Sequence, residues 1–198
     1  YDPLLHAVMN RVRKKVADIA GHLQPERILD ICCGTGNQLK YLRHHGFDNI
    51  IGVDISDAML AQARKDSYKT PCESQDASSM NFKDNQFDLG IISFALHEKP
   101  FDTARNIIDE AQRVIHSRGH LILVDYLFRD ASRLPARVAV HTVERIAGKS
   151  HYHYFRQYLK YGGMDKLMEG YTIQEEYRFH GNATGIRVYP MDKYGQYA

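Results

Sequence analysis

Short apolar runs alternate with amphipathic stretches along most of this chain. The apolar runs lie at about 27–32, 49–54, 72–76, 87–94 and 120–127. They are shorter than ordinary helices and rich in branched side chains, which favours buried strands. Apolar residues recur at helical spacing in the stretches near 5–23, 37–46, 57–68 and 101–115. Strands that alternate with helices in this way predict an α/β fold with a parallel sheet and right-handed crossovers.

The pattern changes after residue 128. We predict helices at 134–146 and 151–161, a short helix at 164–169, and strands at 171–180 and 186–189. The last two strands flank Gly181-Asn182, which is typical of a hairpin turn. A length of 198 residues suits one domain. We therefore expect a single domain over 1–198, with an N-terminal helix over 1–24 and a helical insertion over 129–163 that covers the active site.

The end of the first predicted strand carries the most informative residues. Asp30 lies within the apolar run, and Gly34 and Gly36 form a turn into the next helix. Glycines allow a ligand to approach the backbone, and a helix N-terminus offers unpaired N–H groups. The second strand ends in Asp54, about 20 residues after the turn, where an acid can bind ribose hydroxyls. These residues predict a nucleotide-like ligand at the carboxyl edge of the sheet.

This arrangement resembles the class I S-adenosylmethionine-dependent methyltransferases. Residues 28–36 match the first motif of that family, Asp54 its ribose-binding acid, and Asp76 its acid near the adenine. The resemblance covers residues 1–128 well and the remainder in outline. It implies a Rossmann-like, doubly wound, mostly parallel sheet of seven strands with a C-terminal antiparallel hairpin. It also implies S-adenosylmethionine as the methyl donor and S-adenosylhomocysteine as the product.

The same resemblance implies roles for the donor-binding residues. Gly34 and Gly36 would pass under the donor, Asp54 would bind its ribose, and Asp30 would anchor its methionine end. The adenine would pack on apolar side chains and donate a hydrogen bond to the third acid. The full expected set is Asp30, Gly34, Gly36, Asp54, Ile55, Met59, Asp76, Ala77 and Ser93. One departure is Cys32, because the family usually has glycine there.

Two other classes of function are weighed against this one. A nicotinamide dinucleotide fold has a third glycine in its turn, where this chain has Leu39. A protein that binds S-adenosylmethionine without catalysis, as a sensor or a partner subunit, would keep the same turn and acids. The segment 129–163 resembles that of the small-molecule branch, including quinone-biosynthesis-type enzymes. We therefore expect methyl transfer to a small molecule.

The acceptor side is less defined in the sequence. His97 follows the fourth strand, where donor and acceptor would meet, and is the candidate general base. It could instead only cap the strand. The run 151–161 is unusually aromatic, and it forms either a wall of the acceptor pocket or ordinary packing. The expected acceptor contacts are Glu98, Tyr126, Tyr154 and Tyr158.

A metal site is not expected. His97 could combine with His141, His151 and His153, but the positions of the last two are awkward for a shared ligand set on one helix. Methyl transfer from a sulfonium is an in-line displacement that needs no metal.

Composition excludes some partners. A net charge of +2 is too small to favour nucleic acid, and no apolar run is long enough for an integral membrane segment. Three cysteines without a paired framework or zinc spacing suit a reducing compartment, and the N-terminus lacks a signal-peptide pattern. We expect a cytoplasmic protein, and the sequence predicts no oligomeric state.

Overall fold

The computed structural model describes residues 3–65, 71–128 and 133–192. Its centre is a sheet of seven strands in the order β3-β2-β1-β4-β5-β7-β6. The strands are β1 (Ile28–Ile31), β2 (Ile50–Asp54), β3 (Cys72–Ser74), β4 (Phe87–Ser93), β5 (Ile115–Tyr126), β6 (Glu175–Phe179) and β7 (Thr184–Pro190). The first five are parallel, and β7 is antiparallel to both β5 and β6. The predicted fold class, including its closing hairpin, is confirmed.

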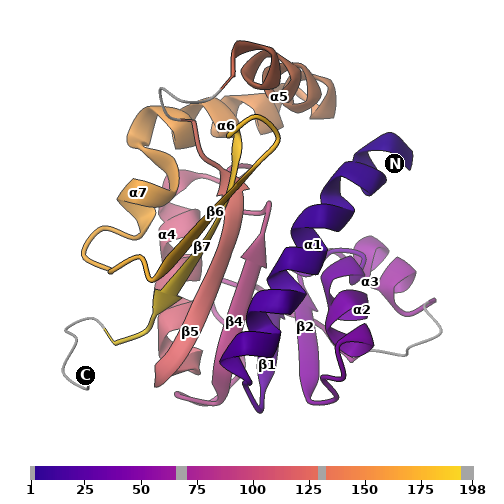
Figure 1. Cartoon of the computed structure of the whole chain (residues 1–198), viewed down its shortest axis with the longest axis vertical. Coiled ribbons are helices and arrows are strands. Elements are labelled where there is room, and N and C mark those ends of the chain that lie inside the picture. Colours follow the sequence, from indigo (N-terminus) through magenta and orange to yellow (C-terminus); the bar gives the residue numbers. More distant parts are fainter. Residues whose placement is uncertain (1–2, 66–70, 129–132, 193–198) are drawn as a thin grey trace.

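Helices cover both faces of the sheet (Figure 1). On one face, α1 (Pro3–Leu23) and α2 (Asn37–His44) bury an apolar stripe that includes Val16 and Leu39. On the other face lie α4 (Phe101–Val114), α6 (Lys149–Tyr161) and α7 (Gly163–Leu167). The helix α3 (Asp57–Ala63) packs beside β2 and β3. The result is the doubly wound arrangement that the alternating pattern predicts.

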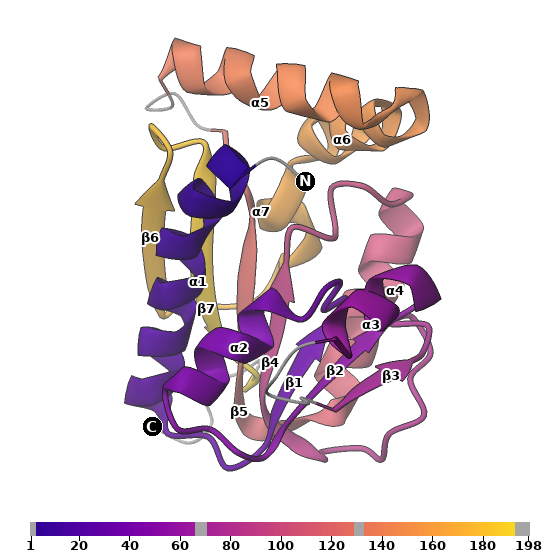
Figure 2. The same ribbon diagram turned by 90° about the vertical axis from the view of Figure 1, so that its right-hand side faces the viewer.

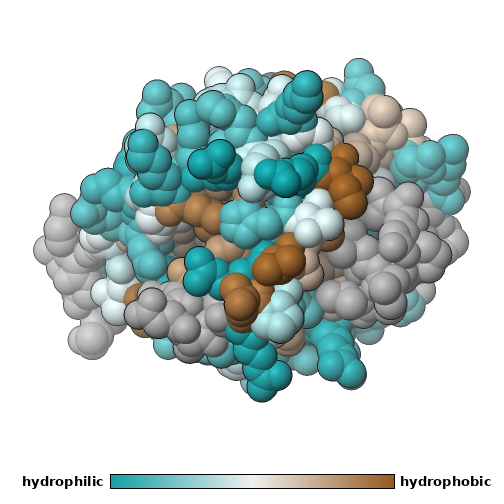
Figure 3. Space-filling view, turned by 90° about the horizontal axis from the view of Figure 1, so that it is seen from above, coloured by the Kyte–Doolittle hydropathy of each residue, from teal (hydrophilic) through white to brown (hydrophobic). Residues whose placement is uncertain are grey.

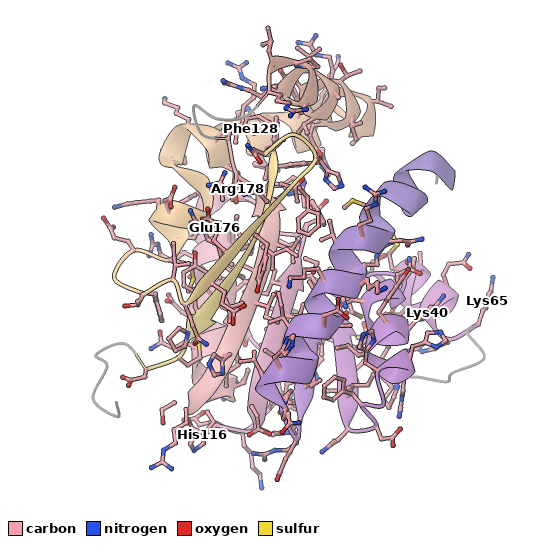
Figure 4. All side chains as sticks on the ribbon, viewed as in Figure 1. Lys40, Lys65, His116, Phe128, Glu176 and Arg178 are labelled. Atoms are coloured by element: carbon pink, nitrogen blue, oxygen red, sulfur yellow. The ribbon has the colours of Figure 1, made fainter. Side chains whose placement is uncertain are left out.

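The helix α5 (Leu134–Ala147) lies across the carboxyl ends of the parallel strands together with α6 (Figure 2). Phe128, labelled in Figure 4, joins these layers. Its ring contacts those of Tyr126 at the end of β5, His141 on α5 and Phe155 on α6. Residues 129–132 of the predicted insertion lie outside the described residues. No helix in the described part of the chain is long and apolar enough to cross a bilayer.

Several element boundaries differ from the predictions. Ile115, predicted on the helical face, is the first residue of β5 and pairs with Phe87. The pairing register then shifts before His120, and the backbone at Gly119 comes close to β4 there. A side chain at Gly119 would meet the Asp88 carbonyl oxygen at 2.5 Å, so the position requires glycine. In addition, α3 ends at Ala63, five residues before its predicted end, while the first closing strand begins at Glu175 rather than 171.

Candidate active site

A cavity of about 870 Å³ opens at the carboxyl ends of β1, β2 and β4, beneath α5. This volume falls within the range of about 300–1,000 Å³ that is usual for small-molecule sites. Seen from above, apolar side chains gather around a hollow in this end of the molecule (Figure 3). Topology explains the position, because ligands in open α/β sheets bind where the strand order reverses, here between β1 and β4.

The turn after β1 forms one wall of the cavity. Cys32, Cys33 and Gly34 line it. Cys32 has a φ of 59° and Gly34 a φ of 55°, so a residue with a side chain stands at a left-handed position that favours glycine. Phe94, which follows β4, also has a positive φ of 54° and lines the cavity. Strained backbone of this kind is concentrated at functional sites.

Gly36 does not line the cavity. It precedes α2 with a φ of 69°, and a side chain there would meet the Cβ of Ala63 at 3.2 Å. In the described structure, Gly36 therefore allows the left-handed turn into α2 and the close packing of this turn against Ala63 of α3.

Asp54 ties the first two strand ends together. Its Oδ2 accepts a hydrogen bond from the Gly34 N–H at 2.8 Å, and its Oδ1 accepts one from the Ser56 N–H at 2.8 Å. Ser56 in turn caps α3 by accepting from the Met59 N–H. A carboxylate can accept about four hydrogen bonds, so Asp54 retains acceptor capacity toward a ligand in the cavity.

Apolar and acidic side chains continue the wall beyond Asp54. Ile55 and Met59 line the cavity yet are 67% and 38% exposed, which leaves two apolar side chains open to a ligand. Ala77 also lines the cavity and is buried. Asp76 accepts hydrogen bonds from the Ser78 hydroxyl at 2.7 Å and the Ser78 N–H at 2.8 Å, and these bonds lower the pKa of its carboxyl.

Two buried polar atoms at the floor of the cavity have no hydrogen-bond partner among the described residues. They are Oδ2 of Asp30 and Oγ of Ser93. Burial raises the pKa of Asp30 well above its usual value, and electrostatic interactions with Cys72 and Asp54 add to this effect. Buried polar atoms in proteins are nearly always paired. These two atoms therefore fit the polar methionine end of the predicted donor.

His97 occupies the opposite side of the cavity. Its Nδ1 lies 2.6 Å from Oδ1 of Asp125, and the carboxylate there makes Nδ1 the protonated nitrogen. Only 3% of His97 is exposed. Burial by itself lowers the pKa of His97, but Asp125, through its charge and its hydrogen bond, and the charges of Glu144 and Glu98 together raise it above its usual value. An imidazole that holds its proton firmly is a poorer general base than a free histidine.

Glu144 lies beside His97, although no sequence pattern predicted it there. It is a buried acid on α5, and its Oε1 accepts a hydrogen bond from the Tyr126 hydroxyl at 2.7 Å. Its Oε2 lies 2.7 Å from Nε2 of His151 and 3.6 Å from Nε2 of His97. Glu144 is one of several charged residues in a predicted amphipathic helix, so no local pattern marks it.

The predicted acceptor contacts divide into two groups. Glu98 and Tyr126 line the cavity. Tyr154 and Tyr158 do not. Tyr158 belongs to the core between α6 and the sheet, whereas Tyr154 is half-buried with its ring centroid 5.5 Å from that of His153. Tyr158 is 2% exposed and donates a hydrogen bond to the Tyr126 carbonyl at 3.2 Å. Of the two interpretations of the aromatic run, packing therefore describes Tyr158.

The combination of His97 with His141, His151 and His153, which the sequence disfavours, does not assemble among the described residues. His141 lies 3.3 Å from the Tyr152 hydroxyl and His153 lies 3.1 Å from the Gln157 amide. His151 alone among the three approaches His97, with ring centroids 5.7 Å apart.

Comparisons with known proteins agree with this geometry. A family model described as a methyltransferase domain matches residues 29–123. A demethylmenaquinone methyltransferase of Bacteroides fragilis is 26% identical over 81% of this chain and 72% of its own. One of Thermotoga maritima is 28% identical over 64% of this chain and 55% of its own. The chain spans about half the length of most of the curated relatives it matches.

Solved structures share the fold. The PH0226 protein of Pyrococcus horikoshii superposes with a TM-score of 0.65 over 91% of this chain and 89% of its own, at 17% identity. The methyltransferase domain of the bacterial protein CtHen1 gives a TM-score of 0.69 over 92% and 99%, at 14% identity. Identities this low support the fold alone. The family match and the curated relatives together identify residues 29–123 as a methyltransferase domain.

Proposed function

We propose that this protein transfers the methyl group of S-adenosylmethionine to a small-molecule acceptor. One observation carries the proposal: a single cavity is lined at one end by the glycine turn with Asp30, Asp54 and Asp76, and at the other by the cluster around His97. The first group suits a nucleoside with a charged amino-acid tail. The second group suits a molecule that must be held in a fixed orientation beside it.

On this proposal, each donor-binding residue acts on a different part of the donor. Asp54 accepts hydrogen bonds from the ribose hydroxyls with the lone pairs that Gly34 and Ser56 leave. Ile55 and Met59 cover the adenine, and Asp76 accepts from its amino group. Asp30 pairs its buried oxygen with the donor's ammonium group, helped by Ser93. Gly34 lets the backbone pass close beneath.

The protein's contribution to the reaction would be alignment. S-adenosylmethionine, when bound, supplies a methyl group on a positively charged sulfur. As the acceptor atom forms its bond to the methyl carbon, the carbon–sulfur bond breaks and its electron pair stays on sulfur. The cavity residues hold the two reactants in line and exclude water, which is how such a displacement is accelerated. His97, Glu98 and Tyr126 would contact the acceptor.

The shape of the acceptor side supports a small molecule. Ala136, Val140 and Val143 of α5 supply an apolar lining above the site, and His97 and Glu144 supply polar groups. An apolar ring or chain that carries one polar group matches this lining. The relatives named as demethylmenaquinone methyltransferases favour an acceptor of that kind.

The test is turnover. The purified chain is incubated with S-adenosylmethionine and a panel of hydroxylated aromatic compounds, reduced quinones and amines, and S-adenosylhomocysteine is quantified. We expect acceptor-dependent product for at least one class. Donor binding without turnover for any class would favour the alternative of a sensor or a partner subunit. Absence of donor binding would contradict the proposal itself.

A further inference from the structure

The cluster on the acceptor side has an unusual charge composition. It holds three carboxylates, those of Glu98, Asp125 and Glu144, and two histidines, His97 and His151. Within the described ranges, no lysine or arginine forms an ion pair with any of these carboxylates. Asp125 is 1% exposed and Glu144 3%. Buried carboxylates need compensating positive charge, so either protons on both histidines or a bound cation must supply it.

The histidines are oriented as metal ligands usually are. His97 has Nδ1 held by Asp125 at 2.6 Å, which leaves Nε2 to face the cluster. His151 has Nε2 beside Glu144 at 2.7 Å, while its Nδ1 lies 3.5 Å from Oε2 of Glu98. In each ring one nitrogen lies within hydrogen-bond distance of a buried carboxylate. The other nitrogen makes no such bond and lies 3.6 Å from Oε2 of Glu144 in His97, and 3.5 Å from Oε2 of Glu98 in His151. Carboxylates that orient histidines in this way accompany most histidine–metal bonds.

The ligand atoms are also close enough to share one ion. His97, Glu98 and His151 each offer one atom, and these atoms all lie within 4.8 Å of one another. Two of the residues lie directly after β4 and the third lies on α6, so the fold brings the set together.

We propose that His97, Glu98 and His151 bind a divalent transition-metal ion of the zinc class, with Asp125 and Glu144 as the carboxylates that orient the two histidines. Two imidazoles and one carboxylate are a usual ligand set for zinc in sites that keep a fourth position open. The lack of a thiolate disfavours copper(I), and the imidazoles disfavour magnesium and calcium. The prediction of no metal from the sequence considered histidine spacing along one helix, and it could not include Glu98 as a partner of His151.

The open position would face the cavity that the same residues line. There the ion would hold an oxygen or nitrogen atom of the acceptor and so fix its orientation. This role rests on the proposed methyl transfer, whereas metal binding itself does not.

The experiment measures metal binding directly. Untagged protein is stripped with a chelator and titrated with zinc by calorimetry, and cobalt(II) is added separately to record ligand-field absorption. We expect one ion per chain with a dissociation constant on the order of micromolar or tighter, and visible bands that zinc abolishes. Glu98→Gln and His151→Ala should each weaken binding by more than the roughly 10- to 100-fold that is usual for loss of an orienting partner.

The matched control is His153→Ala, which removes an exposed histidine from the same helix and should leave zinc affinity unchanged. Binding of S-adenosylhomocysteine and the melting temperature are measured on every variant, so that a misfolded variant is recognised. Among the ligand variants, Glu98→Gln changes a half-buried side chain and is expected to disturb folding least. Zinc binding that is absent in the wild type, or equal in all three variants, would overturn the proposal and leave protonated histidines as the source of the charge. A wild-type protein that binds zinc but does not bind S-adenosylhomocysteine would instead count against the proposed function alone.

Discussion

Two carboxylates at the same edge of the sheet differ in their surroundings. Asp54 accepts two backbone hydrogen bonds and so shapes the turn at Gly34 even without a ligand. Asp30, two residues before Cys32, is 1% exposed and keeps one oxygen unpaired in the described structure. We expect a hydrogen-bond donor of the bound ligand to pair with this oxygen.

Asp30 should make the stability of the fold depend on pH. Burial raises its folded-state pKa, so the folded chain binds this proton more tightly than the unfolded chain does. Its contribution to stability is then complete below the unfolded pKa of about 4 and is lost as the pH rises through the folded pKa. Replacement by asparagine removes the titration. Urea unfolding from about pH 4 to pH 7 should therefore show a smaller decline in Asp30→Asn than in the wild type. Parallel profiles for the two proteins would contradict this account.

At the scale of elements, α6 is an integral layer of the fold. Its Phe155 is fully buried and contacts the rings of Tyr126, Phe128 and His141. Phe155→Ala should lower the free energy of unfolding by about 3–5 kcal/mol, because it leaves a cavity among packed rings. Arg156→Ala, at the exposed neighbouring position, should change it by less than about 0.5 kcal/mol. Equal effects in denaturant unfolding would mean that α6 packs loosely, as a detachable lid would.

The helix α5 has a different role, because it contributes more to the cavity than to the core. Val140 is half-buried and lines the acceptor side. Val140→Phe adds volume there and should raise the KM of an identified acceptor by about 10-fold or more, since lost contacts of about 1.4 kcal/mol correspond to that factor. Affinity for S-adenosylhomocysteine should stay the same. A loss of S-adenosylhomocysteine affinity with unchanged acceptor KM would reverse the assignment of the two ends.

The sequence predicts elements best where one pattern dominates. The parallel strands and their helices follow from apolar runs and helical periodicity. Ile115 was misassigned because an apolar residue after an amphipathic helix satisfies either structure. Its place in β5 depends on pairing with Phe87, which is a contact between distant segments.

At the scale of the whole molecule, the donor side was predictable and the acceptor side largely was not. Asp30, Asp54 and Asp76 follow successive strands, so parallel topology brings them to one edge. Glu144 and His151 reach His97 only because α5 and α6 fold back over that edge. No local spacing encodes that return, and the aromatic pattern of α6 reflects packing.

The two ends of the cavity give the molecule its proposed chemistry, and the donor end can be tested without knowing the acceptor. The most direct measurement is calorimetric titration of S-adenosylhomocysteine into the wild type, Asp54→Ala and Asp48→Ala. Asp48 is the control: its side chain is 94% exposed and lies before β2, at the opposite edge of the sheet.

We expect binding by the wild type and by Asp48→Ala, with affinity about 10- to 100-fold lower in Asp54→Ala, because charged hydrogen bonds to ribose are worth roughly 1.5–3 kcal/mol. Equal affinity in all three proteins, or tighter binding of NAD than of S-adenosylhomocysteine by the wild type, would contradict it.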